Sequence, residues 1–277
     1  AYPLGLSSRR IAGVGYPMQV SADQVQQFTE LGYTTVDGFF EPNEVAAIRR
    51  EIDRWLLSGL PRDVSTDPEK RQNLQLIPLH ERSTLFRALP FAPKVIESVA
   101  ALIGHPIMKI LDQMFVKPAT LGMGTHWHTD NAYFHLTNPM AGVAMWIAVD
   151  DATVENGTLR VIPGAFRETF PHTPDVDSNH HIRTQIDETR ALNLELEAGG
   201  VAFFCFGTPH ATGDNSSASA RAGVGVHFVN VDKAEGHTSA RWQQIRVSGN
   251  EATSGQREYG YRVDFEIEVA RALRSAD

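Results

Sequence analysis

The feature that most constrains the fold is a change in sequence texture after Gly104. Before this residue, apolar side chains recur at helical spacing, whereas the chain beyond it consists of short β-rich runs separated by Gly, Pro and Asn turns. So many short strands favour a double-sheet jelly roll, or double-stranded β-helix, with the N-terminal helices packed on one sheet. The candidate strands are IMKILDQMFVK (107–117), AGVAMWIAVDD (141–151), GTLRVIPG (157–164), LNLELEA (192–198), GVAFFCF (200–206), AGVGVHFVNV (222–231) and YRVDFEIE (261–268).

The first predicted helix is ADQVQQFTEL, residues 22–31. Ser21 is placed to cap its N-terminus, its apolar residues share one face, and Gly32 supplies the stop. The segment YTTVDGFF (33–40) follows, and its β-branched and aromatic residues predict a short strand that ends in a turn.

The remaining segments predict one domain of mixed α and β structure that covers residues 1–277. Pro42 is placed in the first turn of a second helix with an apolar stripe, and a third helix is predicted over about 92–103. Residues 1–20 read as an extended arm. Residues 165–192 are long, polar and weakly periodic, which is typical of a lid or binding loop.

The composition is that of an ordinary globular protein, and it excludes some classes of function. The formal net charge of -8 argues against a nucleic-acid-binding protein, which would normally present a basic face. A single cysteine, Cys205, permits no internal disulfide. No apolar run approaches the ~20 residues of a membrane-spanning helix, and the chain starts without a secretory signal, so we expect no membrane partner and a cytoplasmic protein.

The segment GTHWHTDNAYFHL (124–136) concentrates imidazole and carboxylate groups beside aromatic residues. Residues at positions i and i+2 of a strand project to the same face, so either His126 with His128 or His128 with Asp130 could bind one ion together. His210, which follows the apolar run FFCF, is the candidate third ligand. Two imidazoles and one carboxylate with open positions opposite suit non-haem Fe(II) and its oxygen chemistry.

Arg221 follows His210 at the start of the next predicted strand. An arginine that faces the interior near a metal is costly unless it binds an anion, and its planar guanidinium matches a carboxylate in two hydrogen bonds. The metal and the arginine together therefore describe a pocket for a diacid, with one end on the metal and the other on Arg221.

Over nearly its whole length the sequence resembles the phytanoyl-CoA dioxygenase family of Fe(II)/2-oxoglutarate-dependent oxygenases. The segments that carry the resemblance are QFTELGYTTVDGFFEPNEV, HWHTDNAYF, MWIAVDDATVENGTLRVIPGAF and PHATGDNSSASAR. The resemblance implies Fe(II) as the metal, 2-oxoglutarate and O2 as co-substrates, and ascorbate as an aid to activity in vitro.

The same resemblance implies roles for individual residues. Arg221 matches the partner of the distal carboxylate of 2-oxoglutarate, and Gln113 and Trp146 match positions that line the co-substrate pocket. The positions that match the iron ligands are His128, Asp130 and His210.

The resemblance also bears on the type of reaction. Asp130 occupies the position where related halogenases carry a small residue, so halogenation is not expected, while hydroxylation, desaturation, epimerisation and cyclisation all remain open. The family's usual Gly-Ser-His is replaced here by Gly164-Ala165-Phe166. This change removes a polar pair near the mouth of the site and argues against assuming a CoA-linked substrate.

The predicted substrate is a small molecule, and the candidates for its binding wall are aromatic. Tyr133 and Phe134 would alternate on a strand, so only one of them should face the pocket. Two more candidates, Phe166 and Phe170, lie at the start of the long loop. These rings favour a ring-containing or moderately apolar substrate.

Two other functions are compatible with the sequence. One is a non-catalytic jelly-roll binding protein, and the other is a cupin-like metalloenzyme that uses His126 with His128 and His210 and needs no 2-oxoglutarate. We expect His126 instead to be a surface imidazole or a support for a ligand. The pair His180-His181 should not bind a metal, because adjacent residues of an extended chain point in opposite directions. Nothing in the sequence indicates the oligomeric state.

Overall fold

The computed structural model describes residues 20–234 and 243–274. The extended arm predicted for residues 1–20 lies outside this range, apart from Val20. Within the described residues, no helix combines the length and the apolar character that crossing a bilayer requires.

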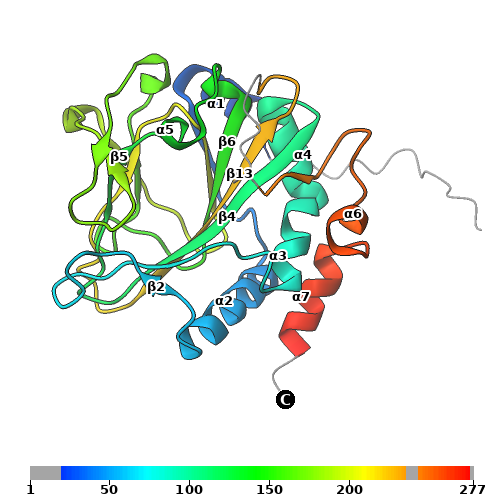
Figure 1. Ribbon diagram of the computed structural model, residues 1–277, viewed down its shortest axis with the longest axis horizontal. Coiled ribbons are helices and arrows are strands. Elements are labelled where there is room, and N and C mark those ends of the chain that lie inside the picture. Colours follow the sequence, from blue (N-terminus) through cyan, green and yellow to red (C-terminus); the bar gives the residue numbers. More distant parts are fainter. Residues whose placement is uncertain (1–19, 235–242, 275–277) are drawn as a thin grey trace, which may run out of the picture.

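Two antiparallel sheets form the body of the structure, which confirms the predicted jelly roll (Figure 1). The large sheet has the order β1-β11-β6-β13-β4-β3-β2, with β14 also pairing with β4, and the small sheet has the order β10-β7-β12-β5. A separate hairpin pairs β8 with β9. The strands are β1 Tyr33–Val36, β2 Arg62–Asp63, β3 Leu74–Leu76, β4 Ile107–Lys117, β5 Thr125–His128, β6 Gly142–Ala148, β7 Leu159–Val161, β8 Thr173–Pro174, β9 Ile182–Arg183, β10 Leu192–Leu194, β11 Val201–Cys205, β12 His210–Thr212, β13 Arg221–Asn230 and β14 Ile245–Arg246.

Helices cover the outer face of the large sheet, whereas its inner face meets the small sheet (Figure 1). Every residue of β6 is therefore buried, because both of its faces are covered. The α-helices are α1 Ala22–Leu31, α2 Pro42–Leu57, α3 Thr84–Ala88, α4 Pro93–Ile103, α5 Asn131–Phe134, α6 Gln256–Tyr259 and α7 Phe265–Arg274. The 3-10 turns are η1 Leu89–Phe91, η2 Pro139–Ala141, η3 Ala165–Arg167 and η4 Glu188–Arg190.

The helix-capping residues lie where the sequence predicts them. The Ser21 hydroxyl accepts a hydrogen bond from the Gln24 amide, and the Gln24 side chain accepts one from the Ser21 amide at 2.8 Å, which completes a capping box. Gly32 ends α1 with φ of 79°. A Cβ at this position would lie 2.6 Å from the Phe166 ring, so glycine is required by both conformation and space.

The strand predicted over 261–268 is wrong, because the second half of this segment begins α7 and the first half forms no strand. The apolar residues of this segment do alternate, but in the structure its buried residues follow the period of a helix. Phe265 and Val269 are buried one helical turn apart in the core that α7 shares with α2, whereas Ile267 is 54% exposed. The Asp264 carboxylate accepts a hydrogen bond from the Ile267 amide and caps the start of the helix.

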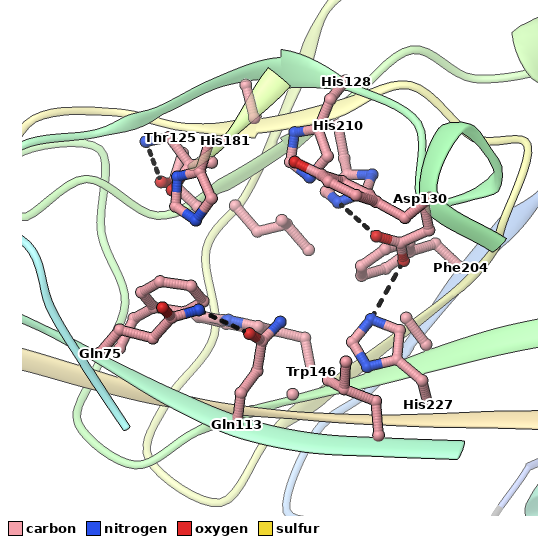
Figure 2. A pocket seen from close by; sticks show the side chains of 18 of the residues that line it. Gln75, Gln113, Thr125, His128, Asp130, Trp146, His181, Phe204, His210 and His227 are labelled. Carbon is pink, nitrogen blue, oxygen red and sulfur yellow. Dashed lines mark hydrogen bonds and ion pairs between the residues drawn. The ribbon is translucent and has the colours of Figure 1, made fainter. Parts of the chain in front are cut away.

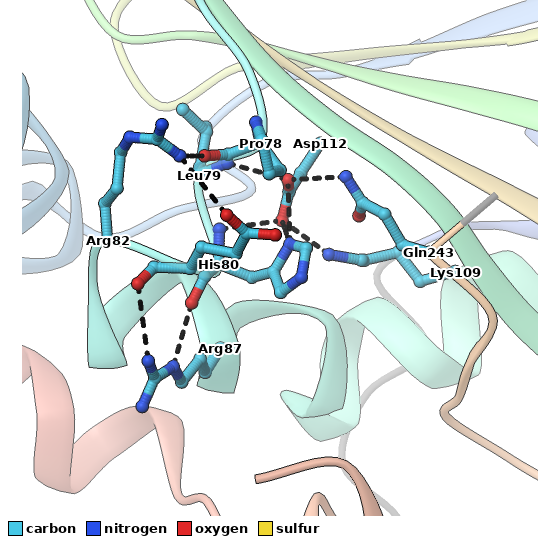
Figure 3. A network of polar contacts seen from close by, with 9 residues as sticks. Pro78, Leu79, His80, Arg82, Arg87, Lys109, Asp112 and Gln243 are labelled. Atoms are coloured by element: carbon cyan, nitrogen blue, oxygen red, sulfur yellow. Dashed lines mark hydrogen bonds and ion pairs between the residues drawn. The ribbon is translucent and has the colours of Figure 1, made fainter. Parts of the chain in front are cut away.

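A buried polar network lies between the outer face of β4 and the segment that follows β3 (Figure 3). The Asp112 carboxylate accepts hydrogen bonds from the backbone amides of Leu79 and His80, at 2.8 and 3.2 Å, and from Gln243 at 3.1 Å. It also pairs with the fully buried Lys109 at 2.5 Å. Burial alone would raise the pKa of Asp112, but Lys109 and His80 hold it well below its ordinary value. The network therefore anchors the chain segment after β3 to β4.

We expect Asp112→Ala to lower the free energy of unfolding by about 3 to 5 kcal/mol, because it leaves the Lys109 ammonium buried without its partner. Urea unfolding monitored by circular dichroism measures the change. Replacing both residues, in Lys109→Met/Asp112→Leu, should recover much of the loss. Arg190→Ala serves as the control, because its ion pair with Glu168 is exposed and should contribute no more than about 1 kcal/mol. If Asp112→Ala and Arg190→Ala lose equal stability, the buried pair of Asp112 and Lys109 does not stabilise the fold in the way expected here.

Candidate metal centre and cavity

The pairing of β5 with β12 brings together two imidazoles that are distant in the sequence. His128 and His210 are register partners, and their ring centroids lie 4.2 Å apart. Asp130 follows directly after β5, and its Oδ1 lies 3.7 Å from Nε2 of His210 (Figure 2). The candidate ligand atoms of these three buried residues all lie within 4.8 Å of one another. The structure thus brings together the three residues that the sequence implied as iron ligands.

The tautomers of both histidines suit metal binding. Nδ1 of His128 lies 2.8 Å from the carbonyl oxygen of His126, and Nδ1 of His210 lies 3.0 Å from that of Thr208. A carbonyl only accepts a hydrogen bond, so each Nδ1 carries the proton and each Nε2 keeps its lone pair. This backbone support fixes the ring orientation and presents both Nε2 atoms as ligands.

The electrostatic environment keeps the three groups in the protonation states that a divalent metal needs. Burial, reinforced by His210, lowers the pKa of His128 to about 3, and burial also lowers the pKa of His210. Burial would raise the pKa of Asp130, but His227 and His210 hold it well below its ordinary value. Two neutral imidazoles and one carboxylate can therefore accept a metal without first losing a proton. This donor set fits Fe(II).

A cavity of about 250 Å³ opens beside the three residues. Its wall is mostly apolar and aromatic, and among the described residues Asp130 is the one Asp, Glu, Lys or Arg that lines it. The residues of the wall apart from the three candidate ligands include Gln75, Ile77, Leu111, Gln113, Phe115, Thr125, Tyr133, Phe134, Trp146, Leu159, His180, His181, Phe204, Thr212 and His227.

Two of the three residues expected to bind the co-substrate lie on the cavity wall. Gln113 accepts a hydrogen bond from the Gln75 amide at 2.9 Å, and Trp146 lies on the same face of the large sheet, with Gly225 between them in register (Figure 2). Arg221 is buried behind Trp146, with its guanidinium carbon 5.4 Å from the indole centroid. The guanidinium donates to the carbonyl oxygen of Gly157, and its Nε has no hydrogen-bond partner in the described residues.

A second buried basic residue, Lys117, was not found by sequence reasoning. Lys117 is the register partner of Arg221 on the neighbouring strand, so both side chains extend from the same face of the large sheet. Both are buried, and burial followed by the charge of Arg221 lowers the pKa of Lys117 well below its ordinary value. Lys117 donates only to carbonyl oxygens, those of Gly157 and Gly213, among the residues described. The sequence signal was the lysine at the end of an apolar strand.

Tyr133 and Phe134 both line the cavity, so the expectation that only one of them would do so is wrong. The chain turns into α5 directly after Asp130, and successive side chains of a helix do not point in opposite directions as they do on a strand. The Tyr133 ring lies 6.0 Å from that of His128, and its hydroxyl accepts a hydrogen bond from the Ile182 amide at 3.0 Å.

Phe166 and Phe170, the other two candidates for the substrate wall, do not line this cavity, and their assignment to it is wrong. Gly164 turns the chain with φ of 75°, and its amide donates to the carbonyl oxygen of Leu31 at 2.8 Å. This turn directs Phe166 into the core beneath α1. Phe170 lines a separate hollow on the other side of the 129–132 segment.

Three further histidines considered in the sequence, His126, His180 and His181, do not belong to the candidate metal centre. His126 is 39% exposed and lies outside the candidate metal centre, because its Nδ1 lies 2.8 Å from a carboxylate oxygen of Asp175. His180 and His181 both line the cavity with ring centroids 4.2 Å apart, so the expectation that they would point in opposite directions is wrong. They precede β9 in an irregular stretch rather than on an extended strand, which allows both rings to turn the same way.

The fold and this site define an oxygenase of the Fe(II)/2-oxoglutarate class. The family model described as Phytanoyl-CoA dioxygenase (PhyH) matches residues 28–223, so the chain belongs to this family. An ectoine dioxygenase of Streptomyces anulatus is 24% identical over 242 residues, which cover 79% of this chain and 82% of the relative. A phytanoyl-CoA dioxygenase of Arabidopsis thaliana is 21% identical over 263 residues, which cover 79% and 92% of the two chains.

Solved structures confirm the fold. The non-haem carbocyclase SnoK from nogalamycin biosynthesis superposes with a TM-score of 0.66 at 21% identity, covering 76% of this chain and 84% of that chain. EctD from S. alaskensis, solved with 2-oxoglutarate and 5-hydroxyectoine, superposes with a TM-score of 0.64 at 19% identity and covers 79% of both chains.

The buried imidazole of His181 should make stability depend on pH. Burial, with a smaller contribution from His180, lowers the pKa of His181 from 6.5 to about 4. As the pH falls, the imidazole is therefore protonated in the unfolded chain before it is protonated in the folded one. The contribution of neutral His181 to the free energy of unfolding is complete above pH 6.5 and is lost as the pH falls towards 4. We expect His181→Leu to reduce the pH dependence of unfolding in this window by at most about 1.4 kcal/mol per pH unit.

Urea unfolding of the metal-free protein at several pH values measures this effect. Phe115→Leu is the matched control, because Phe115 packs against the His181 ring at 5.8 Å but does not titrate. Its curve should run parallel to that of the wild type. If the His181→Leu curve does the same, the expectation is wrong.

Proposed function

We propose that this oxygenase oxidises a C–H bond of an uncharged small molecule, such as an intermediate of natural-product synthesis, and releases succinate and CO2. The observation that carries the proposal is the buried cluster of His128, Asp130 and His210 at the edge of a largely apolar cavity. Hydroxylation, desaturation, epimerisation and cyclisation are the reactions open to it, since each can begin with the oxidation of a C–H bond.

In this proposal, the three clustered side chains hold Fe(II). Two neutral Nε2 atoms and one carboxylate oxygen would occupy one side of the metal and leave the side towards the cavity free. When bound, Fe(II) with 2-oxoglutarate and O2 supplies the oxidising chemistry. The chain itself orients the ligands through the backbone carbonyls of His126 and Thr208 and encloses the site in apolar side chains that exclude water.

Arg221 is proposed to bind the distal carboxylate of 2-oxoglutarate, with Gln113 and Trp146 along the length of the co-substrate. Among the described residues, the buried guanidinium donates to the carbonyl oxygen of Gly157 and its Nε has no partner, which leaves capacity for an anion. The neighbouring Lys117, which is also buried, places a second N–H donor at the same end of the sheet. A dianion would thus find positive charge at each of its two ends, the metal at one and the Arg221 guanidinium at the other.

The lining of the cavity supports an uncharged substrate. Beyond the proposed ligands, the wall towards Tyr133 and Phe134 consists of aromatic and aliphatic groups, with neutral imidazole and amide groups from His181 and Gln75. A charged substrate would lose its hydration there without gaining an opposite charge, which is unfavourable. The carbocyclase SnoK and the epimerase SnoN, structural neighbours that both come from nogalamycin biosynthesis, support an intermediate of natural-product synthesis as the substrate.

The two alternative functions receive less support. A binding protein that had lost its chemistry would have no need of three metal-binding side chains and a buried arginine. A cupin-like site that used His126 would require that ring to turn away from Asp175, 2.8 Å from it, and towards His210.

The first test is succinate formation by the purified protein, loaded anaerobically with Fe(II) and then given 2-oxoglutarate, ascorbate and air with a panel of neutral and charged small molecules. We expect the wild type to release succinate, and neutral ring-containing compounds to stimulate release most. Asp130→Ala should release none, because removing the carboxylate leaves two ligands. Turnover by Asp130→Ala equal to that of the wild type would instead support the site built on His126.

Arg221→Ala should raise the concentration of 2-oxoglutarate needed for half-maximal succinate release by about 10- to 100-fold, which corresponds to a charge-assisted bidentate contact of about 1.5 to 3 kcal/mol. Titration of 2-oxoglutarate at saturating Fe(II) measures the change. Arg160→Ala is the control, because Arg160 pairs with Glu188 outside the cavity. An unchanged requirement in Arg221→Ala would place the anion site elsewhere.

A further inference from the structure

We infer that His227 is a positioning residue that holds one oxygen of the Asp130 carboxylate and thereby turns the other towards the metal. This inference rests on the proposed metal centre. His227 lies on β13, where its register partners are Ala144 on β6 and Leu111 on β4, and its ring reaches into the cavity from the floor of the large sheet (Figure 2).

The two oxygens of Asp130 face different partners. Oδ1 lies 3.7 Å from Nε2 of His210, on the side of the candidate metal centre, and Oδ2 lies 3.2 Å from Nε2 of His227. Oδ2 is buried and has no well-aligned hydrogen bond from the described residues. A buried carboxylate oxygen without a donor is costly, and hydrogen bonds of this kind are often long until the site is occupied. His227 is the nearby group that can supply the donor.

The surroundings of His227 leave its ring little freedom. It is 5% exposed and packs against the stacked pair of Phe134 and Phe206, whose centroids lie 5.6 and 5.9 Å from its own. Its Nδ1 is buried without a hydrogen-bond partner in the described part of the chain. Because a carboxylate accepts hydrogen bonds only, the contact with Oδ2 assigns the proton to Nε2. The aromatic pair thus aims one N–H group at Asp130.

This arrangement leaves a single oxygen of Asp130 for the metal. A carboxylate that rotates freely can bind a metal through one oxygen or through both, and the second mode takes up a position that the co-substrates need. Holding Oδ2 in place removes the rotation and favours binding through Oδ1 alone. His227 itself does not belong to the group of ligand atoms that lie within 4.8 Å of one another, so it acts through Asp130.

Losing such a partner of a metal ligand typically weakens metal binding by about 10- to 100-fold. We therefore expect His227→Leu to bind Co(II), used as an oxygen-stable probe, about 10- to 100-fold more weakly than the wild type in isothermal titration calorimetry. His227→Gln keeps an N–H group at a similar reach and should recover most of the affinity. The visible spectrum of bound Co(II) should change in His227→Leu and return towards that of the wild type in His227→Gln.

Two further variants separate positioning from general damage. Val226→Ala removes a buried side chain from the opposite face of β13 and should lower the melting temperature without weakening Co(II) binding. If His227→Leu does not fold, His227→Phe offers a second side chain without a donor, suited to the aromatic surroundings. The Co(II) affinity of His227→Phe should be as low as that expected for His227→Leu.

The outcomes distinguish this inference from the proposed function. If the wild type binds Co(II) and the variants without a donor bind it equally well, the inference is wrong and the metal centre stands. Equal weakness of His227→Gln and His227→Leu would also overturn the role as a donor. Absence of Co(II) binding by the wild type would overturn the proposed function, and the inference with it.

Discussion

The site depends on one interaction, the antiparallel pairing of β5 with β12. This pairing makes His128 and His210 register partners, and the turn into α5 directly after β5 adds Asp130 to them. The small sheet that contains this pair is held against the large sheet by a shared apolar core. A shift of one residue in the pairing would turn one imidazole to the opposite face, so the core that sets the register also sets the ligand geometry.

The buried charged groups on the two faces of the large sheet differ in how completely they are paired. On the outer face, Asp112 accepts hydrogen bonds from two backbone amides and pairs with Lys109, so the charges there are fully compensated. On the inner face, within the part of the chain that the structure describes, Arg221 keeps an unpaired Nε and Asp130 keeps an oxygen without a well-aligned donor. Compensated groups stabilise the fold, whereas groups with unused capacity are what a metal and an anion can satisfy. The same strands β4 and β13 thus support both the fold and the chemistry.

The segment 165–192, predicted as a lid, contributes part of the cavity wall through His180 and His181. It is joined to the metal centre through the Tyr133 hydroxyl, which accepts from the Ile182 amide, and through His126, which pairs with Asp175. Both contacts come from residues next to the candidate ligands in the sequence. A substrate that displaces His181 would therefore act on the same short segment that carries His128 and Asp130.

The sequence by itself determined the jelly roll and the helices α1, α2 and α4, because these depend on local periodicity and capping chemistry. Residue spacing placed His128 and His210 among the candidate ligands, and the resemblance to the family selected Asp130 as the third. It could not determine that 265–274 is a helix, since alternating apolar residues there fit a strand until α2 offers a partner for a helical face. Tertiary structure alone decided that Phe166 turns into the core, that His181 enters the cavity, and that His227 and Lys117 approach the site. The physical reason is that these positions depend on register and on turns between distant segments, which no local pattern encodes.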